Sequence, residues 1–231
     1  MIALPIECYR AIFNNLYKDL FSCILVNRQW CRIIIPILWS DTKKHFKNIK
    51  LIEMFLLTLN AKEQALLIPF KITLPNQQKP LFEYTSYITS VNNDLYHGVS
   101  NLIQDRKYET GDELRNAINC SLISMFLRTS KNLEYLSLNE VICSQLIFEN
   151  LYENTTIISI DIGSCNNISR SNAMDVLIKV LYKNSNLTSL NLSNQIERVR
   201  SSLNSIGSDG GKALADVLCQ NKFFEGSESS K

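Results

Sequence analysis

Few side chains in this sequence could carry out catalysis or hold a metal ion. The histidines are His45 and His97, and neither belongs to a nucleophile or metal-ligand motif. The seven cysteines, at positions 8, 23, 31, 120, 143, 165 and 219, lie mostly in apolar stretches and form no C-x-x-C pair. General acid–base catalysis needs a positioned base with partners, and zinc needs ligands at short spacings. We therefore expect no catalytic site, no metal and no cofactor.

The composition is that of a folded protein and gives no sign of a polyanion binder. The chain has 231 residues, of which 45% are hydrophobic and 20% charged, with a net charge of +2. Such a small net charge does not favour nucleic acid or a membrane surface as a partner. The sequence contains no run of about 18 apolar residues, and its cysteines suit a reducing compartment. We expect a soluble intracellular protein, cytoplasmic or nuclear.

The first forty residues predict a small helical unit. Pro5 suits the first turn of a helix, where its missing N–H is not needed, and apolar residues then recur at helical spacing up to Leu16. A second short helix is expected over residues 20–24. A third is expected over residues 26–34, and Pro36 should end or kink it.

Residues 42–110 predict a packed, mainly helical connector. Amphipathic spacing favours helices over residues 49–59 and 61–67, and three prolines interrupt the chain soon afterwards. The segments 84–91 and 95–103 fit a helix or a strand, because periodicity over runs this short does not separate the two.

An L-x-x-L-x-L pattern occurs three times in the C-terminal half, with starts 24 and 30 residues apart. Each copy is followed by a helix-like segment that ends in Leu-x-x-Asn. Internal repeats of this size indicate stacked structural units. The three patterns are Leu133-Leu136-Leu138, Ile157-Ile160-Ile162 and Leu187-Leu190-Leu192, and the helix ends are Leu151 to Asn154, Leu181 to Asn184 and Leu218 to Asn221.

Each repeat predicts a short strand backed by a helix. The last two apolar positions of the pattern alternate, so they face one side of a strand, and the following helix covers that side. Neither half can bury its apolar face alone, which favours a curved solenoid with parallel strands on its concave face. A helix over residues 112–127 is expected to belong to a degenerate first repeat. The array then covers residues 111–222, followed by a flexible tail at 223–231.

Strand alternation also identifies the side chains that project from the concave face. These residues are polar and mixed in charge. A face built from so few repeats is small, which favours a short peptide or a transient partner. The candidate substrate-binding residues are Glu134, Tyr135, Ser137, Ser159, Asp161, Thr188, Ser189 and Asn191.

These motifs resemble two known modules. The three copies resemble leucine-rich repeats of the ribonuclease-inhibitor-like subtype, and the second copy has Cys165 where many such repeats carry Cys or Asn. Residues 1–41 resemble an F-box, a three-helix domain. An L-P-x-E start, a central V-x-R-x-W and a terminal L-W carry this likeness. The matching positions are Leu4-Pro5-Ile6-Glu7, Ile12-Phe13, Leu16, Asp19-Leu20, Ser22-Cys23, Val26-Asn27-Arg28-x-Trp30-Cys31 and Leu38-Trp39.

The resemblance implies a substrate adaptor of SCF-type ubiquitin ligases, which direct protein degradation. Such an adaptor is not catalytic. Its F-box helices bind an acidic Skp-family linker protein, and through it a cullin, while the repeats hold a protein substrate. The matching motif positions place the linker-binding residues at Leu4, Pro5, Ile12, Leu16, Leu20, Val26 and Trp30.

Several alternatives remain open at this point. Residues 1–50 carry a net charge of +5, which fits either an acidic partner or a solvated basic face. Ile12, Leu16 and Trp30 fit the unit's own core as well as an interface, whereas Leu4 and Pro5 are expected to form an exposed apolar patch. The chain could also be a repeat scaffold that recruits no ligase. An enzyme with an unrecognised site is a third alternative, which the lack of a convergent polar cluster disfavours.

Overall fold

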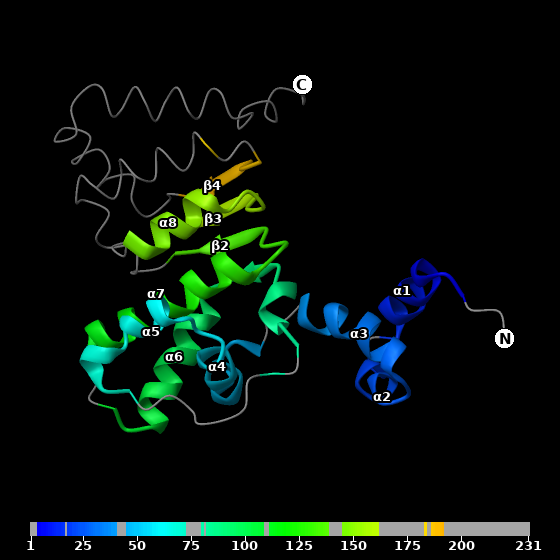
Figure 1. The fold of residues 1–231 in the computed structure, drawn as a ribbon, viewed down its shortest axis with the longest axis horizontal. Coiled ribbons are helices and arrows are strands. Elements are labelled where there is room, and N and C mark those ends of the chain that lie inside the picture. The colour runs from blue at the N-terminus through cyan, green and yellow to red at the C-terminus, as the bar shows by residue number, and fades with distance from the viewer. Residues whose placement is uncertain are drawn as a thin grey trace, which may run out of the picture.

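The structure is a computed structural model that describes residues 4–16, 18–40, 45–72, 80, 82–108, 111–138, 145–161, 183 and 186–191. The described chain is mostly helical and contains a small parallel sheet, which confirms the expected combination of α and α/β structure. Figure 1 shows two parts, a three-helix unit of residues 4–40 and a body of residues 45–191. Apart from residue 183, the predicted helix that ends at Leu181 to Asn184 lies outside the described residues, as do the Leu218 to Asn221 motif and the tail at 223–231.

The three-helix unit has the predicted elements and a small core of its own. Helices α1 (Ile6–Asn15), α2 (Leu20–Ile24) and α3 (Arg28–Ser40) follow one another closely. The Asn27 side chain accepts a hydrogen bond from the Trp30 backbone N–H at 2.9 Å and so caps the start of α3. The fully buried core consists of Phe13, Leu20, Ile33 and Ile34.

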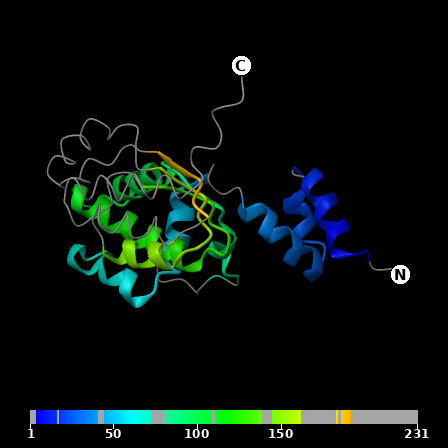
Figure 2. The same ribbon diagram turned by 90° about the horizontal axis from the view of Figure 1, so that it is seen from above.

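Helix α3 does not end at Pro36, which was one of the two outcomes expected from the sequence, and runs on to Ser40. A proline inside a helix removes one backbone hydrogen bond, so contacts beyond it must hold the last turn. The Trp39 ring stacks on Tyr84 with centroids 4.5 Å apart, and the Thr89 hydroxyl donates to the Ser40 carbonyl at 3.0 Å. Both partners belong to the body, which α3 reaches from the three-helix unit (Figure 2).

The helices of the body surround one long central helix. Helix α7 (Asp112–Thr129) is buried continuously from Ile118 to Leu127. The two helices predicted in the connector are present but shorter than expected, and the ambiguous segments form a 3-10 turn, a strand and a helix. The surrounding elements are α4 (Ile49–Leu56), α5 (Ala61–Ala65), η2 (Ile68–Phe70), η3 (Tyr84–Tyr87), α6 (Asp94–Asp105) and α8 (Gln145–Glu153).

The sheet contains β1 (Ser90–Val91), β2 (Tyr135–Ser137), β3 (Ser159–Asp161) and β4 (Ser189–Asn191), all parallel and in sequence order. The last three strands are those of the three sequence repeats. Strand β1 lies within the predicted connector, where the apolar positions are too few to show the pattern. One hydrophobic core extends from Phe46 to Leu187, so the connector and the repeats form one packed unit rather than two.

The turns before the strands repeat the same hydrogen bonds. The backbone N–H groups of Glu134, Ile158 and Thr188 each donate at 2.8 Å to a carbonyl in the preceding unit. The accepting carbonyls belong to Thr89, Glu134 and Ile158, in that order. The sequence repeat is therefore also a repeat of backbone geometry, with each unit joined to the one before it in the same register.

The Asn of the Leu-x-x-Asn motif shapes these turns. The Asn154 side-chain oxygen accepts from the N–H groups of Thr156 at 3.0 Å and Ile157 at 3.2 Å, while its amide donates to the Leu127 carbonyl at 3.4 Å. Ser130 takes the equivalent place before β2, where its hydroxyl donates to the Ile88 carbonyl. These buried side chains satisfy backbone groups between neighbouring units, which an apolar residue could not do.

Helix α6 contacts the segment before α4 so closely that Gly98 has no room for a side chain. A Cβ atom at Gly98 would overlap the Phe46 carbonyl oxygen, whereas a Cβ at Gly111 would meet nothing within 4 Å. Crowding against backbone cannot be relieved by a change of rotamer. We expect Gly98→Ala to lower the free energy of unfolding by about 2 kcal/mol or more, as measured by urea denaturation.

Gly111→Ala is the matched control for this prediction. It adds the same methyl group in open space at the start of α7, so the urea midpoint should move little. Equal midpoints for the two variants would show that α6 does not pack against Phe46 in this way.

Candidate functional site

Helix α1 presents a row of exposed side chains that its own unit does not bury. Cys8 and Ile12 lie one turn apart on α1, whereas Leu4 lies just before the helix and Leu16 just after it. The three aliphatic side chains are 47%, 44% and 39% exposed, and Pro5 beside them is also exposed. The expected exposure of Leu4 and Pro5 is confirmed. We call Leu4, Cys8, Ile12 and Leu16 the α1 stripe.

A second apolar group lies on α2 and the turn after it. Phe21, Leu25 and Val26 are 70%, 75% and 59% exposed. Val26 was expected from the motif, but Phe21 and Leu25 were not. Phe21 and Leu25 are four residues apart, a helical spacing in the sequence that could have identified them as a second apolar group.

Two of the predicted linker-binding residues belong instead to the core of the three-helix unit. Leu20 is fully buried, and Trp30 is half-buried with its ring 5.1 Å from that of Phe13. Both side chains point between the helices because a unit this small needs its largest apolar groups to fill its own interior. Leu20 is therefore not available to a partner in this structure, and Trp30 is only partly so.

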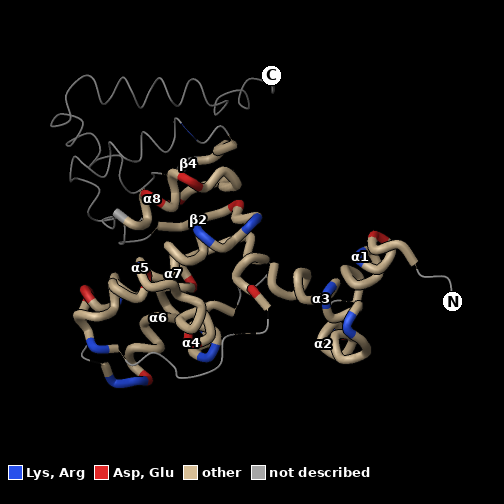
Figure 3. Tube along the Cα trace, in the orientation of Figure 1, with Lys and Arg blue, Asp and Glu red and all other residues tan. Residues whose placement is uncertain are grey.

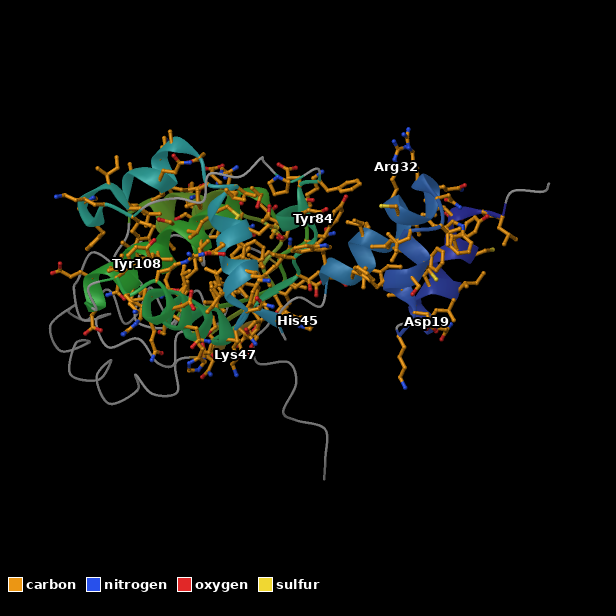
Figure 4. The ribbon with its side chains drawn as sticks, turned by 90° about the horizontal axis from the view of Figure 1, so that it is seen from below. Asp19, Arg32, His45, Lys47, Tyr84 and Tyr108 are labelled. Carbon is orange, nitrogen blue, oxygen red and sulfur yellow. The ribbon has the colours of Figure 1, made fainter. Side chains whose placement is uncertain are left out.

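The charges around the apolar side chains are mainly basic. The described part of the three-helix unit carries Arg10, Lys18, Arg28 and Arg32 against Glu7 and Asp19, a net charge of +2 (Figure 3). Figure 4 shows the Asp19 and Arg32 side chains on different sides of the unit, both pointing away from its core. The same figure places Tyr84 on the side of the body nearest α3.

The strands of the body follow the predicted alternation. Leu136 and Ile160 are fully buried between the sheet and the helices, and their neighbours project from the opposite side. Tyr135, Ser159 and Asp161 are half-buried, while Glu134, Thr188, Ser189 and Asn191 are exposed. We call the outward row Tyr135, Ser159, Asp161, Ser189 and Asn191 the sheet face.

Ser137 does not belong to the accessible part of this surface, contrary to the prediction. It is fully buried, and its hydroxyl donates to the Asn93 side-chain oxygen at 2.6 Å. The Tyr96 hydroxyl also donates to the Ser137 carbonyl at 3.4 Å. Contacts with Asn93 and Tyr96 of the α6 region thus cover Ser137 at the end of β2, whereas Tyr135, Ser159 and Asp161 remain half-buried.

Asp161 is the centre of the hydrogen bonds on the sheet face. Its two carboxylate oxygens accept from the Tyr135 hydroxyl and from the Asn191 side-chain amide, each at 3.2 Å. The donors stand on the strands at either side of β3. One carboxylate therefore links three strands and is held in a fixed orientation.

The described residues contain no group of three or more His, Cys, Asp or Glu side chains arranged to hold a metal ion. His45 lies in the turn before α4 and His97 lies in α6, in separate elements. Cys8, Cys23, Cys31 and Cys120 are free thiols. No described helix is long and apolar enough to cross a membrane.

The chain was compared with family models, curated proteins and solved structures, and none of them matches it.

The pKa of the Tyr135 phenol depends on its surroundings on the sheet face. Burial raises its pKa above the ordinary value of 10.0, and the nearby Asp161 carboxylate raises it further, because a negative charge disfavours the phenolate. We expect Tyr135 to titrate above 10.0, and Asp161→Asn to lower this pKa while burial keeps it above the ordinary value. The measurement is the phenolate absorbance of each protein minus that of its Tyr135→Phe variant during a pH titration.

A pKa for Tyr135 that is unchanged by Asp161→Asn would contradict the contact between the two side chains. Asp105→Asn serves as the control, since this exposed carboxylate at the end of α6 pairs with Arg106 and lies in another part of the body.

Proposed function

We propose that this protein is a substrate adaptor, in which the three-helix unit acts as an F-box and binds a Skp-family linker protein of a ubiquitin ligase. The observation that carries the proposal is the exposed apolar surface of that unit. Seven aliphatic or aromatic side chains between Leu4 and Val26 are exposed, although the unit already has a closed core. Exposed apolar groups concentrated in one small unit favour a protein partner.

The exposed apolar surface of the three-helix unit can contribute to binding. Complete burial of a Leu or Ile side chain contributes about 1.5–3 kcal/mol, and the α1 stripe has three aliphatic side chains that are still partly exposed. The basic residues around them would attract an acidic partner and speed its association. Both properties suit an acidic linker protein.

The body fits the second half of the proposal. We interpret β1 to β4 and their helices as a short leucine-rich-repeat solenoid, because the turns repeat their hydrogen bonds and the apolar positions of β1 to β3, namely Val91, Leu136 and Ile160, are buried. In that arrangement the sheet face is on the concave side, and it would hold the protein substrate. The stacking of the Tyr84 ring on Trp39 would fix the distance between the α1 stripe and the sheet face.

Binding to a purified Skp-family linker protein tests the proposal. The variant Leu4→Ala with Ile12→Ala removes apolar area from the α1 stripe without changing the core of the unit. We expect it to weaken the linker complex about 30-fold or more, equivalent to roughly 2 kcal/mol, in a calorimetric titration. Circular dichroism should show that the variant remains folded.

Ile68→Ala is the control, because Ile68 is 71% exposed but belongs to the body. Its affinity for the linker should equal that of the parent protein. Absence of binding by the folded parent would reject the adaptor function and leave a leucine-rich-repeat scaffold that recruits no ligase.

A further inference from the structure

A pocket lies between two successive turns of the body, where α7 and α8 end. Its volume is about 420 Å³, within the range of about 300–1,000 Å³ that is usual for ligand sites. Residues from 127–131 form one wall and residues from 150–156 form the other. The pocket shares no residue with the α1 stripe or the sheet face, so it is a candidate site separate from both.

Arg128 gives the first wall a cation that is held in place. Its Nε and Nη2 atoms donate to the fully buried Glu63 carboxylate at 2.7 and 2.9 Å. No described residue accepts a hydrogen bond from Nη1, which therefore keeps two N–H groups for another acceptor. The hydrogen bond to Glu63 and, more weakly, the charge of Glu83 raise the pKa of Arg128, so it stays charged. A fixed guanidinium loses little conformational freedom when it binds a ligand.

Lys131 adds a second cation to the same wall. Its backbone N–H donates to the Ser86 carbonyl at 3.1 Å, but its exposed side chain makes no ion pair with a described residue. Glu134, three residues further on, neither lines the pocket nor pairs with Lys131. Glu153 does line the pocket, and its carboxylate pairs with Lys183 at 3.3 Å. Arg128 and Glu153 thus each have a counter-charge, and Lys131 leaves the lining positive.

The opposite wall offers uncharged donors. The backbone carbonyl of Thr155 accepts from the Asn186 amide at 2.7 Å, whereas the Thr155 hydroxyl has no partner among the described residues. The half-buried Asn150 side chain, in the last turns of α8, has none there either. A hydroxyl and an amide are therefore available to donate across the pocket from the two cations.

The carbonyl groups at the ends of α7 and α8 would disfavour an anion if they were free. The turns already use three of them. The Phe126 carbonyl accepts from the Ser130 N–H at 2.9 Å, the Leu127 carbonyl from the Asn154 amide at 3.4 Å, and the Asn150 carbonyl from the Asn154 N–H at 3.0 Å. These hydrogen bonds reduce the negative potential at the helix ends and leave the cations as the main charges of the pocket.

We infer that this pocket binds a phosphate monoester, with Lys131 and Arg128 on its charged oxygens and Thr155 and Asn150 donating from the other wall. A phosphate monoester has three terminal oxygens and a charge of about −1.5 to −2, so it can accept from several converging donors. A carboxylate has two oxygens and a single charge, and makes the weaker match. This site goes beyond the proposed function, and the same phosphate chemistry can be supplied by a phosphorylated protein side chain or by a small phosphorylated molecule.

The test uses fluorescence anisotropy with the full chain and three fluorescein-labelled pools of short peptides. The pools share degenerate uncharged positions and differ only in a central phosphoserine, glutamate or serine. We expect the phosphoserine pool to bind about tenfold more tightly than the serine pool, with the glutamate pool between them. Calorimetric titration with free O-phosphoserine distinguishes the two sources. Tighter binding of the peptides indicates a phosphorylated protein, whereas equal or tighter binding of O-phosphoserine indicates a small molecule.

Four variants separate the pocket from general charge attraction. Lys131→Gln should weaken binding of the phosphate ester about tenfold, while Lys131→Arg keeps the charge and most of the affinity. Thr155→Val removes the hydroxyl without changing the shape of the side chain and should weaken binding about threefold. Lys50→Gln is the control, because it removes one exposed positive charge from α4, which does not line the pocket. Its affinity should equal that of the parent.

Failure of the folded chain to bind either O-phosphoserine or the phosphoserine pool would overturn the inference. Equal affinities of Lys131→Gln and Lys50→Gln for the ester would do the same, as would a glutamate pool that binds as tightly as the phosphoserine pool. Since Lys131, Thr155 and Lys50 are all exposed, thermal unfolding should show that the variants remain folded. These measurements contain no linker protein, so their outcome is independent of the adaptor function.

Discussion

The buried carboxylate of Glu63 is the constraint on which the packing of the body depends. It is fully buried and accepts hydrogen bonds from Arg128 Nε at 2.7 Å, Arg128 Nη2 at 2.9 Å and the Asn60 backbone N–H at 2.7 Å. An unpaired charge at this depth costs several kcal/mol, so α5 must meet the end of α7 in this one geometry. The bond to Glu63 also raises the pKa of Arg128, which stays charged. With α7 positioned, its buried sides set the places of α6, α8 and the sheet.

Helix α3 makes the three-helix unit and the body depend on each other. Its first half carries Ile33 and Ile34 into the core of the three-helix unit, and its last turn carries Trp39 into the core of the body. Because one continuous helix serves both cores, the α1 stripe and the sheet face cannot reorient independently without bending α3 or separating Trp39 from Tyr84. For an adaptor, such a connection would determine where a bound substrate lies relative to the ligase.

Periodicity predicted most of the helices because amphipathic spacing is a local property. The helices of the three-helix unit, α7 and the strands of the three repeats follow directly from it. Of the two outcomes expected at Pro36, an end of the helix does not occur, because Tyr84 and Thr89, distant in sequence, hold the turn beyond it. Strand β1 was not recognised for a similar reason. It has two residues and is a strand only because β2 pairs with it.

The sequence by itself determined which residues are apolar at which spacing, and hence the helices, the repeated strands and the candidate surfaces. Tertiary structure decided which apolar side chains remain outside. Leu16 and Leu20 have the same chemistry, yet the first is exposed and the second fully buried. Likewise Ser137 and Asp161 occupy equivalent strand positions, but Ser137 is fully buried against Asn93 at the start of α6, whereas Asp161 is half-buried. Spacing assigns a residue to one side of a helix or strand, whereas burial depends on which distant element packs against that side.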